Sequence, residues 1–335
     1  MLPYLYNHCR CEQKSAKRVY TFLGVLLITV FLTVIYFVSQ PSTPPKISYY
    51  HWKNTYRSLP DLQVSHPPHR LYIKFLDIGY REKLQLNPTR FVDPPPTGPE
   101  VIPVVFLDNR ALRESSEQVI QDQILKAIPP QHYQNLQIDC DWSEQTREKY
   151  FSLLRTLHES YTTLSATLRL HQVKYATQTG VPPVNYGVLM YYNMSEIRDI
   201  DTRNYVLDHA VGKQYLQNFQ QYPLPMELAL PLYQQVRVIR QQRLALLLPH
   251  GELQSDKLNV LSEGAFEVIK AHYWQGEYLY VGDELVVDEV TIEQLQEASR
   301  DLARHIQPQE IIFYSYQDAR RYPYEALQGL SILFD

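Results

Sequence analysis

The sequence is poor in cysteine. Only three cysteines occur, and Cys9 and Cys11 both precede the longest apolar run of the chain. Cys140 stands alone in the remainder, which excludes an internal disulfide framework there. A domain of this size is stable without disulfides, so their absence leaves the cellular compartment open.

Signatures of cofactor and metal sites are also missing. No G-x-G-x-x-G follows the first predicted strand, and the chain has no P-loop and no G-x-S-x-G. It has no H-E-x-x-H and no paired C-x-x-C. We therefore expect no cofactor and no metal. The formal net charge of −4 lacks the basic excess of a nucleic-acid-binding surface, so we expect no nucleic-acid partner.

A long apolar run lies near the N-terminus. Residues 19–39 read VYTFLGVLLITVFLTVIYFVS and contain no charged side chain. A helix of this length spans about 30 Å, the thickness of the hydrocarbon core of a bilayer. The sequence therefore predicts a single transmembrane helix that contacts the lipid bilayer, with residues 1–18 as a tail.

The orientation of this helix follows from the basic residues beside it. Positive charges next to a transmembrane helix favour the cytoplasmic side, and the helix has them on both sides. They are Lys14, Lys17 and Arg18 before it and Lys46, Lys53 and Arg57 after it. The short tail and the closer spacing favour an N-terminus in the cytoplasm and an extracytoplasmic domain.

A cleaved signal peptide is the competing interpretation of residues 19–39. Its apolar stretch would be shorter and would end at small residues of the A-x-A type, whereas this run ends in YFVSQPSTPP. We favour an uncleaved anchor. Prolines at 41, 44 and 45 then begin a linker and lead-in segment over 40–68.

Apolar runs alternate with helix-like stretches over residues 69–335. Helical spacing is found at 114–128, 145–159, 201–220 and 291–306, and a hairpin is expected at 279–287. The predicted strands are 71–79, 101–109, 135–142, 163–170, 185–193, 226–233, 243–249 and 310–316. This alternation predicts an α/β fold, namely a (β/α)8 TIM-type barrel distorted near its seventh repeat. An open doubly wound sheet is the alternative.

Polar residues gather where the predicted strands end. In such barrels the active groups lie at the carboxyl ends of the strands. The candidates that this rule gives are Asp77, Asp108, Asn109, Asp139, Asp141, Arg169, His171, Tyr191, Tyr192, Asn193, Tyr233 and residues 316–318. The 27 tyrosines of the chain suit either a sugar-binding wall or a core with polar edges.

Asp139 and Asp141 are the sharpest local feature. They are two residues apart on one strand, so they share a face, about 6.6 Å from each other along the chain. Close like charges raise the pKa of one carboxyl, which could then protonate a leaving group. The structural alternative is a buried Asp139 paired with Arg169 of the next strand. We take both aspartates as candidate catalytic residues.

The next strand carries a second polar face. Ser165, Thr167, Arg169 and His171 alternate along it, so Arg169 could orient the aspartates or bind an anionic group. His171 is a candidate proton carrier or a structural residue. Glu227 begins a later strand, where it is either a buried hydrogen-bonded group or a partner acid.

Two of these segments resemble the chitinase-like glycoside hydrolases that use substrate-assisted catalysis. LQIDCDW (136–142) is similar to their D-x-D-W core and LMYYN (189–193) to their M-x-Y-D strand. The resemblance implies a sugar site that includes Trp142, Tyr191 or Tyr192, and Asn193. The family has a catalytic glutamate directly after the tryptophan, where this chain has Ser143, and an aspartate at Asn193.

A second resemblance covers nearly the whole part after the anchor. Ordered blocks such as YYHWKNTYRSL (49–59), VIPVVFLDN (101–109) and LPMELALPLY (224–233) are similar to an uncharacterised family of bacterial envelope proteins. This resemblance implies a glycosidase-like barrel attached to the bacterial inner membrane, without an assigned reaction.

These observations leave two main hypotheses for the function. The first is a membrane-anchored glycan-active enzyme centred on Asp139 and Asp141. The second is a catalytically inactive glycan-binding or envelope-assembly protein. The intact aspartate pair favours the first hypothesis and Ser143 the second, while a purely structural role with an unknown protein partner is a third.

Overall fold

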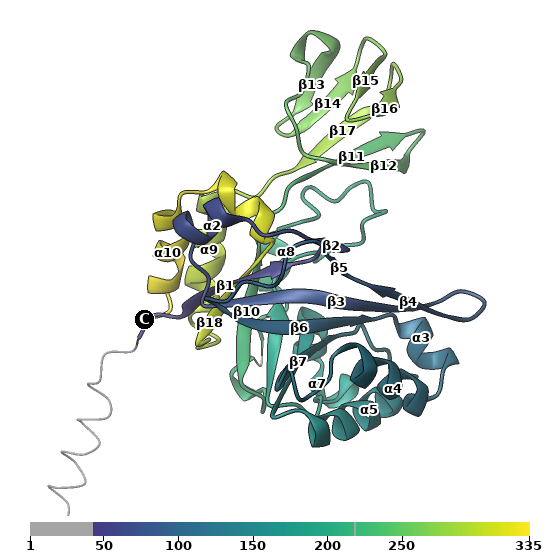
Figure 1. The fold of residues 1–335 in the computed structure, drawn as a ribbon. Coiled ribbons are helices and arrows are strands. Elements are labelled where there is room, and N and C mark those ends of the chain that lie inside the picture. The colour runs from purple at the N-terminus through teal and green to yellow at the C-terminus, as the bar shows by residue number, and fades with distance from the viewer. Residues whose placement is uncertain (1–42, 218) are drawn as a thin grey trace, which may run out of the picture. The chain divides into compact units, whose positions relative to one another are not determined.

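The computed structural model describes residues 43–217 and 219–335. The predicted transmembrane helix over 19–39 lies outside the described residues. Among the described residues, no helix has the length and apolar character needed to cross a membrane. Residues 44–334 form one compact unit, whose architecture is shown in Figure 1.

A closed barrel of parallel strands is the centre of this unit. Each strand pairs with its neighbours in register, and β1 closes the ring by pairing with both β18 and β3. The barrel strands are β1 (Lys46–His51), β3 (Arg70–Tyr80), β6 (Glu100–Leu107), β7 (Asn135–Asp139), β8 (Thr163–Arg169), β9 (Tyr186–Met190), β10 (Met226–Pro231) and β18 (Glu310–Tyr314). The predicted TIM-type α/β barrel is confirmed, and the open-sheet alternative is wrong.

Two strand assignments differ from the sequence-based prediction. Residues 243–249 are not a barrel strand: they form β12 (Arg243–Pro249), in a separate antiparallel sheet. The missing barrel strand is β1, inside the segment expected to be a linker. The apolar run of β12 predicted a buried barrel strand, but this strand stays largely exposed. β1 was not predicted because it has only six residues and follows a proline-rich stretch.

The helices cover the outside of the barrel (Figure 1). Those predicted over 114–128, 145–159 and 291–306 are present. Among the described residues of 201–220, the helical segments are the short α8 and the start of a 3-10 turn at Phe219, and loops occupy most of the rest. The helices are α2 (Pro60–Ser65), α3 (Asn109–Glu114), α4 (Glu117–Ala127), α5 (Arg147–Ser160), α6 (Leu170–Lys174), α7 (Ala176–Thr179), α8 (His209–Lys213), α9 (Ile292–Leu302) and α10 (Tyr324–Ile332). Short 3-10 turns are η1 (Phe219–Gln221), η2 (Ser255–Lys257) and η3 (Tyr316–Arg321).

An all-β insertion separates β10 from the last barrel strand. Its main sheet has the order β12-β11-β17-β14-β13, and β15 pairs with β16 as a hairpin. The predicted hairpin over 279–287 is therefore wrong, because β17 pairs with β11 and β14 instead. The new strands are β11 (Gln235–Arg240), β13 (Leu258–Ser262), β14 (Ala265–Val268), β15 (His272–Trp274), β16 (Glu277–Leu279) and β17 (Glu284–Asp288). Three further short strands, β2 (Thr55–Tyr56), β4 (Leu84–Pro88) and β5 (Arg90–Phe91), lie beside the first barrel strands.

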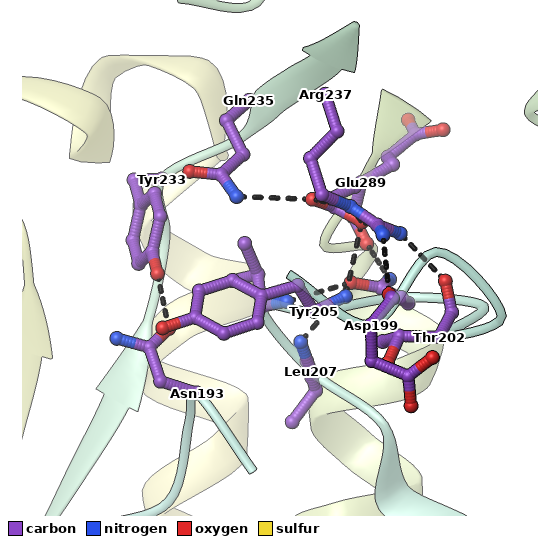
Figure 2. A network of polar contacts seen from close by, with 12 residues as sticks. Asn193, Asp199, Thr202, Tyr205, Leu207, Tyr233, Gln235, Arg237 and Glu289 are labelled. Carbon is purple, nitrogen blue, oxygen red and sulfur yellow. Dashed lines mark hydrogen bonds and ion pairs between the residues drawn. The ribbon is translucent and has the colours of Figure 1, made fainter. Parts of the chain in front are cut away.

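A buried ion pair joins the insertion to the barrel loops. The side chains of Arg237 on β11 and Asp288 on β17 are both fully buried, and Arg237 Nε lies 3.0 Å from an oxygen of Asp288. Arg237 also donates to the backbone carbonyl of Thr202, and Asp288 accepts from the backbone N–H of Tyr205 (Figure 2). These contacts hold the loop after β9 against the insertion.

The buried pair gives a stability prediction. Replacing Arg237 with methionine leaves the Asp288 carboxylate buried without its counter-charge, which costs about 3–5 kcal/mol of unfolding free energy. Urea unfolding of the purified chain measures the loss. The control is Arg203→Met, which removes an exposed pair with Glu263 and is expected to leave the midpoint unchanged. Equal effects of the two substitutions would contradict this assignment.

Candidate functional site

A cavity of about 500 Å³ opens at the carboxyl ends of the barrel strands. Its lining is rich in aromatic rings, which are those of Tyr50, Trp52, Phe106, Tyr192, Tyr205, Tyr233 and Tyr314. Its charged side chains are those of Lys53, Asp139, Asp141, Arg169 and Asp318. An apolar cavity with a few converging polar groups is the usual form of a small-molecule or sugar site.

The polar side chains of β7 and β8 that face the barrel interior form hydrogen bonds across the two strands. Parallel register places Gln137 opposite Ser165, and every second residue then faces the same interior. The amide of Gln137 donates to the hydroxyl of Ser165 at 3.3 Å. The hydroxyl of Thr167 donates to Asp139 at 2.6 Å. Gln137 and Asp139 of β7 are thus both hydrogen-bonded to hydroxyl groups of β8.

Asp139 lies at the inner end of the cavity. Its side chain is buried, and that burial raises the pKa of the Asp139 carboxyl to about 6. The hydrogen bond from Thr167 opposes this rise, and the nearby Asp141 charge adds to it. With a pKa of about 6, the Asp139 carboxyl is protonated in part of the molecules near neutral pH.

Asp141 forms an ion pair with Arg169 at the carboxyl ends of these two strands. Both of its carboxylate oxygens accept from the guanidinium, one from Nε and the other from Nη2. The structural alternative of a pair between Arg169 and Asp139 is therefore wrong, because Arg169 reaches the next carboxylate instead. A two-point pair fixes the plane of both groups and neutralises the Asp141 charge.

The aromatic wall comes from the first and last barrel strands and the ends of β9 and β10. Tyr192 stacks on Tyr314 with ring centroids 5.5 Å apart, and Trp52 lies 6.0 Å from Tyr314. Tyr233 packs on the same ring, and its hydroxyl donates to the side chain of Asn193 (Figure 2). Asn193 is thus held in place by a neighbour.

Eight predicted site residues line this cavity together. They are Asp139, Asp141, Arg169, Tyr192, Asn193, Tyr233, Gln317 and Asp318. The sequence analysis missed Trp52 and Tyr314. Residues at the carboxyl ends of the predicted strands were taken as candidates. This rule would have included Trp52 if Lys46–His51 had been predicted as a strand. It would have included Tyr314 if the last strand had been predicted to end at that residue, two residues earlier.

Other predicted residues lie elsewhere. Trp142 is buried against Tyr150 and donates its indole N–H to the carbonyl of Thr179. Tyr191 points away from Tyr192 and shares a hydrogen bond with His209 at 2.7 Å. His171 lies on α6 and is exposed, although partial shielding of its ring from water and the nearby Arg169 charge lower its pKa. None of the three lines the cavity.

Glu227 lies at the opposite end of the barrel, where β10 begins. It accepts a hydrogen bond from the backbone N–H of Glu310 at 2.7 Å, as the structural interpretation expects. Burial raises the pKa of the Glu227 carboxyl to about 7. Asp77 pairs with Lys74 at 3.0 Å and lines a smaller compartment beside the cavity.

The position that carries glutamate in the chitinase-like pattern turns away from the cavity. Ser143 bonds through its backbone N–H to the hydroxyl of Thr146 at 3.0 Å, and Thr146 in turn donates to Asn109. Glu144 is exposed, and neither residue lines the cavity.

Solved structures with the same fold were found by structural comparison. The spore cortex-lytic enzyme SleL of Bacillus cereus has 13% identity and a TM-score of 0.53, over 88% of this chain and 76% of that chain. A chitinase of Chromobacterium violaceum has 11% identity and a TM-score of 0.55, over 86% and 99%. The chitinase-like agglutinin of Robinia pseudoacacia has 11% identity and a TM-score of 0.53, over 86% and 99%.

These similarities confirm the resemblance to chitinase-like barrels of glycoside hydrolase family 18, at the level of the fold. Comparison of sequences adds nothing to this result, since no family model and no curated protein matches the chain.

The shifted carboxyl of Glu227 gives a pH-dependent prediction. Because its pKa in the folded chain is about 7, above the ordinary 4.5, the protonated form favours folding. That stabilisation is complete below about pH 4.5 and is lost as the pH rises through 7, by an amount on the order of 3 kcal/mol. Glu227→Gln should therefore gain stability over the wild type between pH 5 and pH 8.

Urea midpoints of both chains at the two pH values measure this gain. The exposed Glu252 provides the matched control, since Glu252→Gln is expected to shift both midpoints equally. A wild type and Glu227→Gln that differ by the same amount at pH 5 and pH 8 would show that Glu227 titrates normally.

Proposed function

We propose that the cavity binds a glycan chain and does not hydrolyse it. One observation carries this proposal: the cavity joins an aromatic wall to paired polar groups, yet none of its described carboxyl groups is placed as the exposed proton donor that hydrolysis requires.

The aromatic wall suits a sugar ring. A pyranose has apolar C–H faces and a polar rim, and tyrosine and tryptophan present an apolar face beside a hydrogen-bonding tip. Trp52, Tyr192 and Tyr314 supply such faces within one continuous cluster. The side chains of Asn193 and Gln235 line the same cavity and offer amide groups to sugar hydroxyls.

The carboxyl groups of the cavity are unsuited to glycoside hydrolysis. Hydrolysis of a glycosidic bond needs a carboxylic acid placed to protonate the leaving oxygen, and this holds also where the substrate replaces the second carboxyl group. Asp141 is occupied by Arg169, and Asp318 accepts a hydrogen bond from Ser315 at 2.6 Å. Ser143, at the position of the family's glutamate, carries no proton that it could readily release.

The fold supports a carbohydrate ligand without deciding the reaction. Among its structural neighbours, two are named as a cortex-lytic enzyme and a chitinase, and a third as a chitinase-like agglutinin. Enzymatic and agglutinating proteins thus share this barrel, so the reaction has to be argued from the site residues.

Hydrolysis with Asp139 as the acid is the second candidate. The observation in its favour is the pKa of about 6, which leaves part of the Asp139 carboxyl protonated near neutral pH. Its burial at the inner end of the cavity, with one oxygen bonded to Thr167, makes it the weaker candidate.

We further propose that residues 19–39 anchor the domain to the bacterial inner membrane, with the barrel outside the cytoplasm. The support is the uncharged apolar run and the basic residues directly before it. Such an anchor would keep the glycan-binding cavity within the cell envelope.

The first prediction concerns binding and turnover. The purified chain should bind at least one member of a panel of envelope and dietary glycans in calorimetry, and should release no reducing sugar from it. Trp52→Ala should weaken binding about tenfold or more, because it removes a central ring of the wall. Tyr273→Ala is the control, since this ring is 71% exposed and lies outside the cavity.

Three other results would count against the proposal. Sugar release that disappears in Asp139→Asn would establish the hydrolase instead. Binding that Trp52→Ala leaves intact would place the glycan outside this cavity. An absence of binding across the whole panel would contradict a carbohydrate ligand.

The second prediction concerns the anchor. The chain should sediment with membranes, and deletion of residues 1–42 should release it. In intact spheroplasts a membrane-impermeant maleimide should label a Tyr273→Cys variant but not Cys9 or Cys11, while the buried Cys140 stays unreactive. Labelling of Cys9 or Cys11 alone would reverse the orientation.

A further inference from the structure

A second compartment of about 310 Å³ adjoins the main cavity. The two share the rings of Trp52 and Phe106, whose centroids lie 6.5 Å apart. Beyond these rings the compartment is polar, with Lys74 and Asp77 from β3, Asn87 from β4 and Asp108 after β6. It is therefore a continuation of the cavity along the barrel mouth.

The charges of this compartment do not cancel. The Lys74 ammonium is buried, lies 3.0 Å from one oxygen of Asp77, and sits over the ring of Trp52. The other oxygen of Asp77 is buried and has no hydrogen-bond partner. Asp108 uses one oxygen to cap α3 through the N–H of Arg110. One ammonium thus faces two carboxylates.

The main cavity has no such excess of negative charge. Arg169 balances the charge of Asp141, and Arg321 lies 3.7 Å from Asp318. Lys53 lines the same cavity as Asp139, whose raised pKa leaves its carboxyl partly protonated near neutral pH. The excess of carboxylates is therefore a feature of the second compartment.

We propose that the second compartment is a subsite for a sugar carrying a free amino group, next along the chain to the sugar in the main cavity. This inference rests on the proposed glycan binding. An ammonium group donates hydrogen bonds in several directions and carries the charge that Asp77 and Asp108 lack, while the Trp52 ring lies beside it. An acetylated nitrogen is neutral and has one donor, and a uronate would be repelled.

The Asp77 carboxylate is the strongest support. Lys74 donates to one of its oxygens, while the other is shielded from solvent and has no donor. A buried carboxylate oxygen without a donor is costly. An ammonium group in the compartment would offset the carboxylate charge of Asp77 and Asp108 that Lys74 alone does not balance, which a neutral hydroxyl or acetamido group would not do.

The test compares three oligosaccharides of equal length on the purified full chain in detergent. They are a glucosamine oligomer, its N-acetylated counterpart and an oligogalacturonate, each titrated by calorimetry at pH 6 and low salt. The glucosamine oligomer should bind at least tenfold tighter than the acetylated one, and the uronate should bind weakest.

Two variants assign the preference to the compartment. Asp77→Asn keeps an acceptor for Lys74, and Asp108→Asn keeps a good helix cap, so both should fold. Each should reduce the ratio of the affinities for the amino and acetylated oligomers about fivefold or more, because the lost charge acts on the ammonium and not on the neutral acetamido group. Asp256→Asn, on the exposed turn η2, is the matched control and should leave this ratio unchanged.

The outcomes separate the two proposals. Equal affinity for the amino and acetylated oligomers, or a preference that survives both substitutions, would overturn the amino-sugar subsite and leave glycan binding standing. Tightest binding of the uronate would likewise overturn it. Failure of all three oligomers, and of the wider panel, would overturn the proposed function itself.

Discussion

Strand β1 closes the barrel by pairing with β18 on one side, from Lys46 with Glu310 to Tyr50 with Tyr314, and with β3 on the other. Its alternate side chains then face opposite ways, so Tyr50 enters the barrel interior and Tyr49 packs toward the helices. Because the strand ends at His51, the next residue, Trp52, stands at the cavity mouth between the two compartments. The aromatic wall, and the separation of the cavity from the smaller compartment by Trp52, therefore both depend on the pairing of β1 with β18 and β3.

The interior that the closure creates is unusually polar for a barrel core, and its polar groups are paired. Gln137 bonds with both Tyr50 and Ser165, Asp139 with Thr167, and Asp141 with Arg169. Such pairing satisfies buried groups, but it also occupies the carboxylate that hydrolysis would need free. The same arrangement that makes the polar barrel stable therefore favours binding over turnover.

The sequence predicted the barrel class because most of its strands are apolar runs bounded by turns, and the strand-end rule brought Asp139, Asp141, Arg169 and Asn193 to one cavity. It failed where local pattern and tertiary context disagree. β12 is apolar yet half exposed in the insertion, and β1 was obscured by its proline-rich neighbours. Tyr191 and Tyr192 are neighbours in the chain and point in opposite directions, so only one of them can line the cavity. Trp142 follows the end of β7 and points into the core. Residue spacing alone does not predict these directions, because they depend on where each strand ends.

The chain has three tryptophans, Trp52, Trp142 and Trp274, of which only Trp52 lines the cavity, while the other two are buried in other parts of the fold. A glycan titration followed by intrinsic fluorescence therefore tests directly whether sugar occupies the proposed site. The account predicts a saturable change in emission, with the same midpoint as calorimetry, that disappears in Trp52→Phe. Calorimetric binding without any change in emission, or a change that persists in Trp52→Phe, would contradict a glycan site at the barrel mouth.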